Sequence, residues 1–288
     1  MRYRTRTGND VYANDGQDRF LRLLYGTAPG RFAVKLLTKP AVSKLGGVIL
    51  KSPLSRPFIG PFVRKNQIDL KLYEGVPYRS YNDFFIRRIK KENRPFDPES
   101  SHLVSPCDGK LTVLPISKEG QFCVKHTLYT AESLLKNKGL AKRYEGGLAL
   151  LFRLTVDDYH HYFYVDSGRK SRNVTIPGLF HTVNPTANDV YPIYKENTRQ
   201  YSLLKSDHFG TLLMMEVGAL MVGRIVNLHE AAQVSRGEEK GFFEFGGSTV
   251  ILLFQTGQIQ VDEDILNNSR EGIETIVQAG ERIGKAIR

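Results

Sequence analysis

Five side chains that could do chemistry stand inside otherwise apolar stretches of the sequence. They are Asp108 in SPCDGKL, His160 and His161 in LTVDDYHHYFYV, His181 in GLFHTVNP, and Ser248 in GFFEFGGSTVILLFQ. A carboxylate, an imidazole and a hydroxyl can form an acid, base and nucleophile arrangement, which is recognised by geometry rather than chain order. Each residue alone also has a plain structural interpretation: Asp108 in a turn, the histidines in the core, and Ser248 in a two-glycine hairpin. The histidine pair in a strand pattern predicts one ring inward and one outward, so at most one belongs to a site.

Ser248 is oddly placed for a serine hydrolase. The sequence has no G-x-S-x-G elbow, no Walker A loop, no H-E-x-x-H and no dinucleotide fingerprint. Instead, Gly246 and Gly247 precede the serine, between two apolar runs. Gly247 therefore offers an unhindered backbone carbonyl to the hydroxyl of the very next residue.

The composition predicts a globular protein with a large core. With 288 residues, 41% of them hydrophobic, the chain can form one large domain or two modest ones. Its two cysteines, Cys107 and Cys123, suit neither a disulfide framework nor a four-ligand zinc site, which favours a reducing compartment and no metal. The longest apolar run, 211–226, is short for a bilayer helix and contains Glu216 and Arg224, so we expect no transmembrane segment. The N-terminus has no signal-peptide pattern, and we interpret it as mature sequence.

The net charge of +11 is concentrated in the first quarter of the chain. Residues 1–72 hold fourteen lysines and arginines against four acidic residues, whereas the remainder is nearly balanced. Short apolar clusters alternate there with basic residues and prolines, as in short amphipathic helices that lie in an anionic lipid surface. An ordinary helical subdomain with a solvated basic face is the alternative, and no aromatic-basic motif favours nucleic-acid binding. We expect residues 1–75 to form a basic, membrane-associating region.

From about residue 100 the sequence changes to short β-rich segments separated by glycine turns. This pattern predicts an α+β fold: a mostly antiparallel β core with a helical, basic N-terminal region. Helical apolar spacing over 262–288, with an acidic start, predicts a C-terminal helix. Another helix is expected within 78–97, entered near Asn82 and Asp83 and ended before Pro95.

Five blocks, in order along the chain, resemble the phosphatidylserine decarboxylase family. The blocks are YRSYNDFFIRRIKKENRPFD, SPCDGKL, LTVDDYHHYFYV, GLFHTVNP and SRGEEKGFFEFGGSTVILLF. The resemblance covers about residues 75–288, and the basic first quarter is similar in character alone. It implies a pyruvoyl-dependent decarboxylase domain over residues 76–288.

The resemblance implies that the protein cuts its own chain between Gly247 and Ser248. The Ser248 hydroxyl would attack the Gly247 carbonyl to give an ester, and elimination and hydrolysis would leave a pyruvoyl group on the new N-terminus. The products would be a large chain, 1–247, and a small chain, 248–288, held together without a covalent bond. The glycines suit this step, because they remove the Cβ atoms that would obstruct the attack.

The resemblance also implies roles for the other polar residues. His160 would be the base in self-cleavage, and Asp108 would orient or charge-stabilise it. Many family members carry a second histidine at the position of Phe163, so His161 and His181 stay open as additional or alternative bases.

The implied substrate is an anionic lipid. The pyruvoyl carbonyl would form a Schiff base with phosphatidylserine, and loss of carbon dioxide would give phosphatidylethanolamine. No metal, pyridoxal phosphate or nucleic acid is implied, and a homodimer is left open. The expected location is the cytoplasmic side of a cell membrane, attached peripherally, or an organelle inner membrane in a eukaryote. Two other functions are left open: a pyruvoyl enzyme acting on a soluble amino acid, and a non-enzymatic protein that binds anionic lipid.

Overall fold

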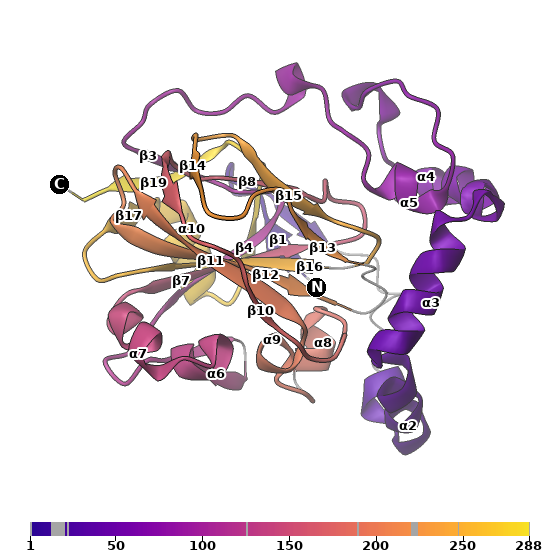
Figure 1. Ribbon diagram of the computed structural model, residues 1–288, viewed down its shortest axis with the longest axis horizontal. Coiled ribbons are helices and arrows are strands. Elements are labelled where there is room, and N and C mark those ends of the chain that lie inside the picture. The colour runs from indigo at the N-terminus through magenta and orange to yellow at the C-terminus, as the bar shows by residue number, and fades with distance from the viewer. Residues whose placement is uncertain are drawn as a thin grey trace.

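The computed structural model describes residues 2–12, 21, 23–124, 126–188, 190–219, 224–246 and 248–287. In this part of the chain, eleven strands form a main sheet in the order β14-β9-β11-β12-β16-β7-β4-β18-β1-β2, with β10 paired to β11 (Figure 1). Its strands are β1 (Arg2–Arg4), β2 (Asp10–Tyr12), β4 (Gly109–Pro115), β7 (Leu148–Leu154), β9 (Gly168–Lys170), β10 (Val174–Ile176), β11 (Arg199–Ser206), β12 (Thr211–Gly218), β14 (Ala232–Val234), β16 (Ser248–Phe254) and β18 (Glu274–Val277). The pairing of β1 with β18 is parallel, and the other pairings in this sheet are antiparallel. The predicted α+β fold with a mostly antiparallel core is confirmed.

Smaller sheets and helices cover the two faces of the main sheet. One face packs on sheet β13-β15-β8, on sheet β17-β19-β3 and on helix α10, and the other packs on helices α6 to α9 (Figure 1). These elements, with the hairpin of β5 and β6, are β3 (His102–Val104), β5 (Gln121–Val124), β6 (Thr127–Thr130), α6 (Ala131–Leu135), α7 (Lys138–Ala141), η4 (Lys142–Tyr144), β8 (His161–Phe163), α8 (Pro185–Asn188), α9 (Ile193–Glu196), β13 (Ile225–Asn227), β15 (Glu239–Phe243), β17 (Ile259–Val261), α10 (Glu263–Arg270) and β19 (Arg282–Ala286). Alternation along the central strand β16 explains the layering, because Val250 and Leu252 face the small sheets whereas Ile251 and Leu253 face the helices.

The predicted C-terminal helix is much shorter than the sequence indicated. Helix α10 spans Glu263–Arg270 only, and the chain then forms β18 and β19. Gly272, with a φ of 70°, follows the end of the helix in a left-handed conformation. Ile276 then pairs with Lys110 of β4, so sheet pairing overrides the helical spacing of the apolar residues.

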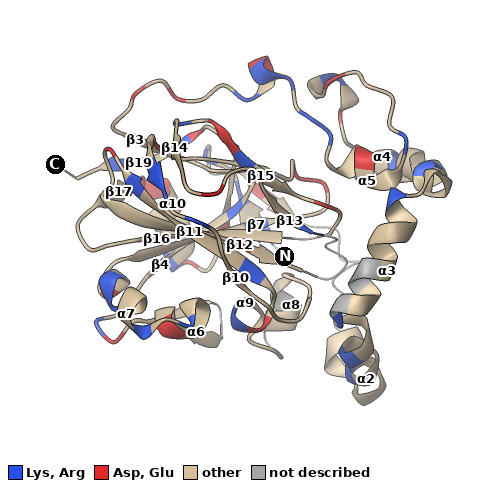
Figure 2. Cartoon of the chain, viewed as in Figure 1, with Lys and Arg blue, Asp and Glu red and all other residues tan. Residues whose placement is uncertain are grey.

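The N-terminal quarter is helical, as predicted, but it also contains two strands that were not predicted. Its helices lie at one side of the β core, and basic residues are distributed along them (Figure 2). They are α2 (Ala28–Leu37), α3 (Pro40–Lys51), η1 (Pro53–Phe58), α4 (Ile59–Lys65) and η2 (Leu70–Leu72). Strands β1 and β2 instead join the main sheet. Arg4 of β1 and Arg6, which follows it, form ion pairs with acidic residues in and next to helix α10.

The helix predicted within 78–97 is also short. Helix α5 covers Tyr81–Phe85, followed by a 3-10 turn, η3 (Lys91–Asn93). Ser80 caps α5, because its hydroxyl accepts a hydrogen bond from the Asp83 amide. Among the described residues, no helix combines the length and the apolar character that a membrane crossing requires.

Candidate active site

Ser248 is the first residue of β16, in the middle of the main sheet. It pairs with Gly218 at the end of β12 and with Leu154 at the end of β7. Its side chain lies on the same face as Val250, toward the sheet formed by β13, β15 and β8, because strand side chains alternate. Its hydroxyl is buried and has no hydrogen-bond partner among the residues that the structure describes. A buried polar atom without a partner is costly, which makes it a candidate for chemistry.

The segment before Ser248 is not a hairpin, so the simple structural interpretation of the two glycines is wrong. Strand β15 pairs with β13 and β8, whereas β16 pairs with β12 and β7 in the main sheet. The chain therefore passes from one sheet to another through the glycines. Gly246 has a φ of 133°, which residues with a side chain rarely adopt. Gly247, half of the expected cleavage site, lies outside the described residues.

His160 lies on the face of the main sheet toward which Ser248 points. His160 is the last residue of the loop that follows β7, and the end of β7 pairs with Ser248. The main-chain carbonyl of His160 accepts a hydrogen bond from the Phe243 amide at 2.9 Å. Its ring Nδ1 lies 2.9 Å from the carbonyl oxygen of Asp158. A carbonyl only accepts, so Nδ1 carries the proton and Nε2 has a free lone pair. Nε2 is buried and, among the described residues, has no hydrogen-bond partner.

Aromatic packing holds the His160 ring and the end of β15 together. Phe85 of α5 lies 4.2 Å from the His160 ring and 5.0 Å from the Phe245 ring, measured between centroids. The side-chain carbonyl of Asn82 accepts a hydrogen bond from the Phe245 amide at 3.1 Å. Burial lowers the pKa of His160 to about 3, so the imidazole is neutral at physiological pH.

His161 is also buried, so the predicted alternation of one inward and one outward ring is wrong. His160 precedes the strand, and His161 begins β8. Both ring nitrogens of His161 have partners: Nδ1 lies 2.8 Å from Glu239 Oε1, and Nε2 lies 3.1 Å from the Ile86 carbonyl. His161 therefore connects α5, β8 and β15 and holds no free lone pair at its ring.

His181 lies on the opposite face of the main sheet from the Ser248 side chain. Its ring stacks on Tyr191 at 4.7 Å and lies 6.1 Å from Tyr25, which packs with Ile251. Burial lowers the pKa of His181 to about 4. The structure thus brings His160, and not His181, to the face of Ser248.

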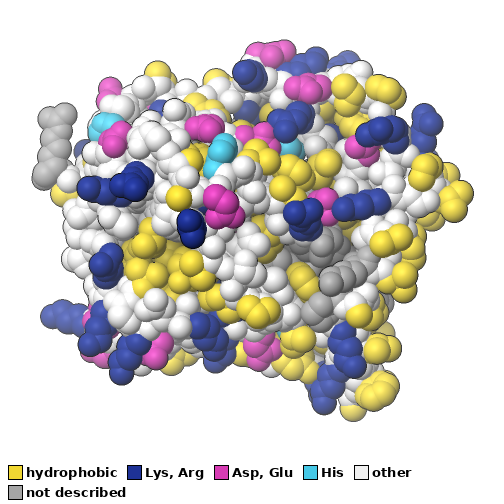
Figure 3. Space-filling view, viewed as in Figure 1, with side chains coloured by type: hydrophobic (Ala, Val, Ile, Leu, Met, Phe, Trp, Pro, Cys, Tyr) yellow, Lys and Arg dark blue, Asp and Glu magenta, His cyan; other side chains and the backbone are white. Residues whose placement is uncertain are grey.

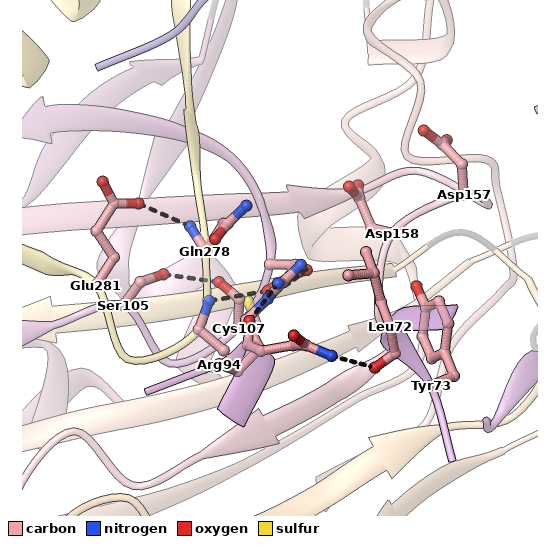
Figure 4. A network of polar contacts seen from close by, with 12 residues as sticks. Leu72, Tyr73, Arg94, Ser105, Cys107, Asp157, Asp158, Gln278 and Glu281 are labelled. Atoms are coloured by element: carbon pink, nitrogen blue, oxygen red, sulfur yellow. Dashed lines mark hydrogen bonds and ion pairs between the residues drawn. The ribbon is translucent and has the colours of Figure 1, made fainter. Parts of the chain in front are cut away.

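Asp108 lies at the same edge of the main sheet as Ser248, directly before β4. Two strand spacings, about 10 Å, separate the start of β4 from the start of β16. The Asp108 carboxylate accepts hydrogen bonds from Arg94 Nη2 at 2.6 Å and from the Ala279 amide at 2.9 Å. Figure 4 shows this network, with Arg94 beside Cys107 and the loop of Asp157 and Asp158 to one side. The His160 ring is oriented by the Asp158 carbonyl, and the Asp108 carboxylate is occupied by Arg94 and Ala279.

The loop that carries His160 is anchored by an ion pair that the sequence analysis did not single out. Lys110 Nζ lies 2.7 Å from Asp158 Oδ2, and the same carboxylate accepts from the Thr155 amide. Burial opposes ionisation of Asp158, but the Lys110 ammonium outweighs it and holds the pKa of this carboxyl below its ordinary value. Lys110 follows Asp108 by two residues, so one short segment contributes to both networks.

The chain matches a known family over most of its length. The family model described as phosphatidylserine decarboxylase matches residues 81–285. Phosphatidylserine decarboxylase proenzyme 2 of Clostridium acetobutylicum is 43% identical over 266 residues, which is 92% of this chain and 91% of that protein. The proenzymes of Ruminiclostridium cellulolyticum and Desulfitobacterium hafniense are 40% and 38% identical, each over 93% of this chain and 92% of the relative.

The chain belongs to the phosphatidylserine decarboxylase family. The resemblance inferred from the sequence blocks is therefore confirmed, and the chain is a proenzyme of the decarboxylase class. The sequence analysis placed no residue of the block YRSYNDFFIRRIKKENRPFD in the site, yet Asn82 contacts Phe245 and Phe85 contacts His160. Their position in one of the five blocks was the available signal.

The low pKa of the two buried histidines predicts a loss of stability in acid. Between pH 6.5 and about 4 the unfolded chain binds protons at His160 and His181 that the folded chain does not, so lowering the pH favours unfolding. We expect the free energy of unfolding to fall by up to about 1.4 kcal/mol per pH unit for each histidine. Urea unfolding at several pH values measures this slope in a Ser248→Ala background, in which we expect no self-cleavage. His160→Gln should remove the contribution of one histidine to the change of unfolding free energy with pH. An unchanged slope would contradict the conclusion that burial lowers the pKa of His160.

Proposed function

We propose that this protein is a phosphatidylserine decarboxylase that makes its own pyruvoyl group by cutting the bond between Gly247 and Ser248. One observation carries the proposal: the Ser248 hydroxyl and His160 Nε2 are both buried, lie on one face of the main sheet, and have no partner among the described residues. The glycines that precede Ser248 connect two sheets rather than closing a hairpin. Family membership supports the same chemistry.

The first step is an acyl shift within the chain. Ser248 Oγ attacks the Gly247 carbonyl carbon and gives up its proton as the C–O bond forms. The C–N bond then breaks as the Ser248 nitrogen takes up a proton, so that an ester replaces the amide. Loss of the Ser248 α-proton with cleavage of its Cβ–Oγ bond then releases Gly247 as a carboxylate. Addition of water to the resulting dehydroalanine, with loss of ammonia, completes the pyruvoyl group.

His160 is the residue placed to accept the proton of Ser248. Its Nδ1 proton is held by the Asp158 carbonyl, so Nε2 is the available base. The pKa of about 3 keeps that nitrogen unprotonated, and Phe85, which packs against both the His160 ring and Phe245, limits its contact with bulk solvent. At the same sheet edge, the Asp108 carboxylate fixes Arg94 and the Ala279 backbone.

The residues present fit a pyruvoyl group at position 248. Position 248 is buried and flanked by the backbone of a paired strand on each side, and the hydroxyl that would be consumed has no structural partner among the described residues. A pyruvoyl group supplies an electrophilic carbonyl that condenses with a substrate amine and accepts the electrons left when carbon dioxide departs. The small chain, 248–288, would stay in place after cleavage, because β16 is paired on both sides within the main sheet.

An anionic membrane is the proposed place of action. Helices α2 and α3 and turn η1 expose large apolar side chains beside exposed lysines and arginines, and Figure 3 shows these two kinds of side chain next to one another over this region. The apolar set includes Phe32 (77% exposed), Leu45, Val48, Ile49, Leu54 (85% exposed) and Phe58. Such a surface suits peripheral binding to anionic lipid, which would bring the phosphatidylserine head group to the enzyme. We propose the cytoplasmic face of a membrane as the location, because the cytoplasmic leaflet carries anionic lipid.

Ser248→Ala should leave one uncut chain, because the nucleophile is removed. Thr249→Ala is the matched control: it removes the next hydroxyl along β16, which points to the other face of the sheet, and should be cut normally. A denaturing gel of the purified proteins distinguishes one chain from two. Efficient cutting of Ser248→Ala, with a pyruvoyl group formed, would refute the mechanism.

Asp108→Asn should slow self-cleavage strongly. It leaves the Arg94 guanidinium, only 13% exposed, without its charged partner, and breaking such a pair costs about 3 to 5 kcal/mol. Asp157→Asn, an exposed carboxylate at the same edge, should be cut at the wild-type rate. A time course of cutting after cell-free synthesis gives both rates. Normal maturation of Asp108→Asn would remove this residue from the site.

Removing exposed apolar groups should weaken membrane binding without affecting self-cleavage. Phe32→Ser with Leu54→Ser should lower affinity for phosphatidylserine-containing vesicles by about tenfold or more, since burial of each side chain contributes about 1.5 to 3 kcal/mol. Leu128→Ser, at an exposed leucine of β6, is the control. Co-sedimentation with vesicles measures the binding. Equal sedimentation of the double variant and the control would contradict the assignment of this surface.

A further inference from the structure

A fully buried ion pair lies on the Ser248 face of the main sheet and takes no part in the chemistry described above. Lys240 Nζ lies 2.8 Å from Glu216 Oε1, and both side chains are 0% exposed. Asn227 completes the cluster, because its Oδ1 accepts from Lys240 and its Nδ2 donates to Glu216 Oε2 at 3.0 Å. Hydrophobic residues in place of such a pair often give equal or greater stability, so stability alone is a weak reason for its presence. Consistent with this cost, burial lowers the pKa of Lys240 despite the neighbouring carboxylate.

Glu216 is a near neighbour of Ser248. On β12, Gly218 pairs with Ser248 and Glu216 pairs with Val250. Glu216 is therefore the diagonal neighbour of Ser248 on the same face of the sheet, a separation of about 7 to 8 Å. The ion pair thus begins on the strand that flanks the nucleophile.

Lys240 is placed by an irregularity in β15. The register of β15 with β8 shifts between Glu239 and Gly241, so Lys240 is the extra residue of a β-bulge. Bulges redirect side chains, and here the side chain reaches the main sheet. At the next residue, a Cβ on Gly241 would lie 1.9 Å from the Val226 carbonyl oxygen, so only glycine allows β13 to approach this closely.

We propose that Glu216, Asn227 and Lys240 form a clamp that sets the offset between the small sheet and the main sheet and so positions residues 243–246, the segment that leads to the bond attacked by Ser248. Strands β15 and β16 lie in different sheets, so pairing between them cannot fix their relative position. The clamp supplies that connection, because it ties β13 and β15 to β12, which is bonded to Ser248. The three are positioning residues, and this inference rests on the proposed self-cleavage.

The double variant Glu216→Gln with Lys240→Met separates positioning from stability. It removes both charges, and the amide introduced at position 216 can still bond with Asn227, so no buried charge is left unpaired. We expect a melting temperature near that of the wild type and self-cleavage slowed by about tenfold to a hundredfold, the effect of a small misplacement of reacting groups. Both are measured on the full chain, by thermal unfolding in a Ser248→Ala background and by a cutting time course after cell-free synthesis.

Two further variants show whether slow cutting follows from instability. Lys240→Met alone leaves Glu216 buried and unpaired and should lower the melting temperature. Asp166→Asn alters another buried carboxylate, bound to Ser206 at the opposite end of β11 from the Ser248 edge, and should lower stability while the folded chain is cut at the normal rate. The clamp is refuted if the double variant is cut as fast as the wild type. It is also refuted if the rate of self-cleavage falls in proportion to the melting temperature in all three variants. A wild-type chain that stays uncut would instead refute the proposed function, and the clamp with it.

Discussion

The pairing of β16 with β12 on one side and β7 on the other is the constraint on which the site depends. It fixes Ser248 at the edge of the sheet where β12 and β7 end and β4 begins. The same pairing brings the loop of His160 and the segment of Asp108 to that edge, although they are distant in the sequence. Because strand side chains alternate, it also decides that Ser248 faces His160 rather than His181.

The site combines strong fixation of its surroundings with two polar atoms left unbonded. The ion pair of Lys110 with Asp158 holds the His160 loop in place. Contacts from Asn82 and Phe85 hold the His160 ring and the segment that follows β15. Within that frame, Ser248 Oγ and His160 Nε2 are buried without partners among the described residues. Two buried polar atoms without partners do not stabilise the fold. Such an arrangement is expected where the hydroxyl is kept for a single reaction of the chain with itself.

The sequence predicted the fold class and the family better than the connections between the elements. The glycine-separated β segments and the ordered blocks were sufficient for the antiparallel core and the family. Local patterns failed where long-range pairing decided the outcome, as at Ile276, which lies in β18 rather than in a helix, and at Gly246, which lies between two sheets rather than in a hairpin. The bulge at Lys240 and the lone pair of His160 Nε2 depend on tertiary contacts that no local spacing encodes.

The denatured mass spectrum of the purified wild-type protein tests the central claim most directly. The account predicts two chains that separate between Gly247 and Ser248, with the small chain lighter by one ammonia than a peptide that begins with serine. A single intact chain that persists in the presence of anionic lipid, or a small chain that begins with unmodified serine, would contradict it.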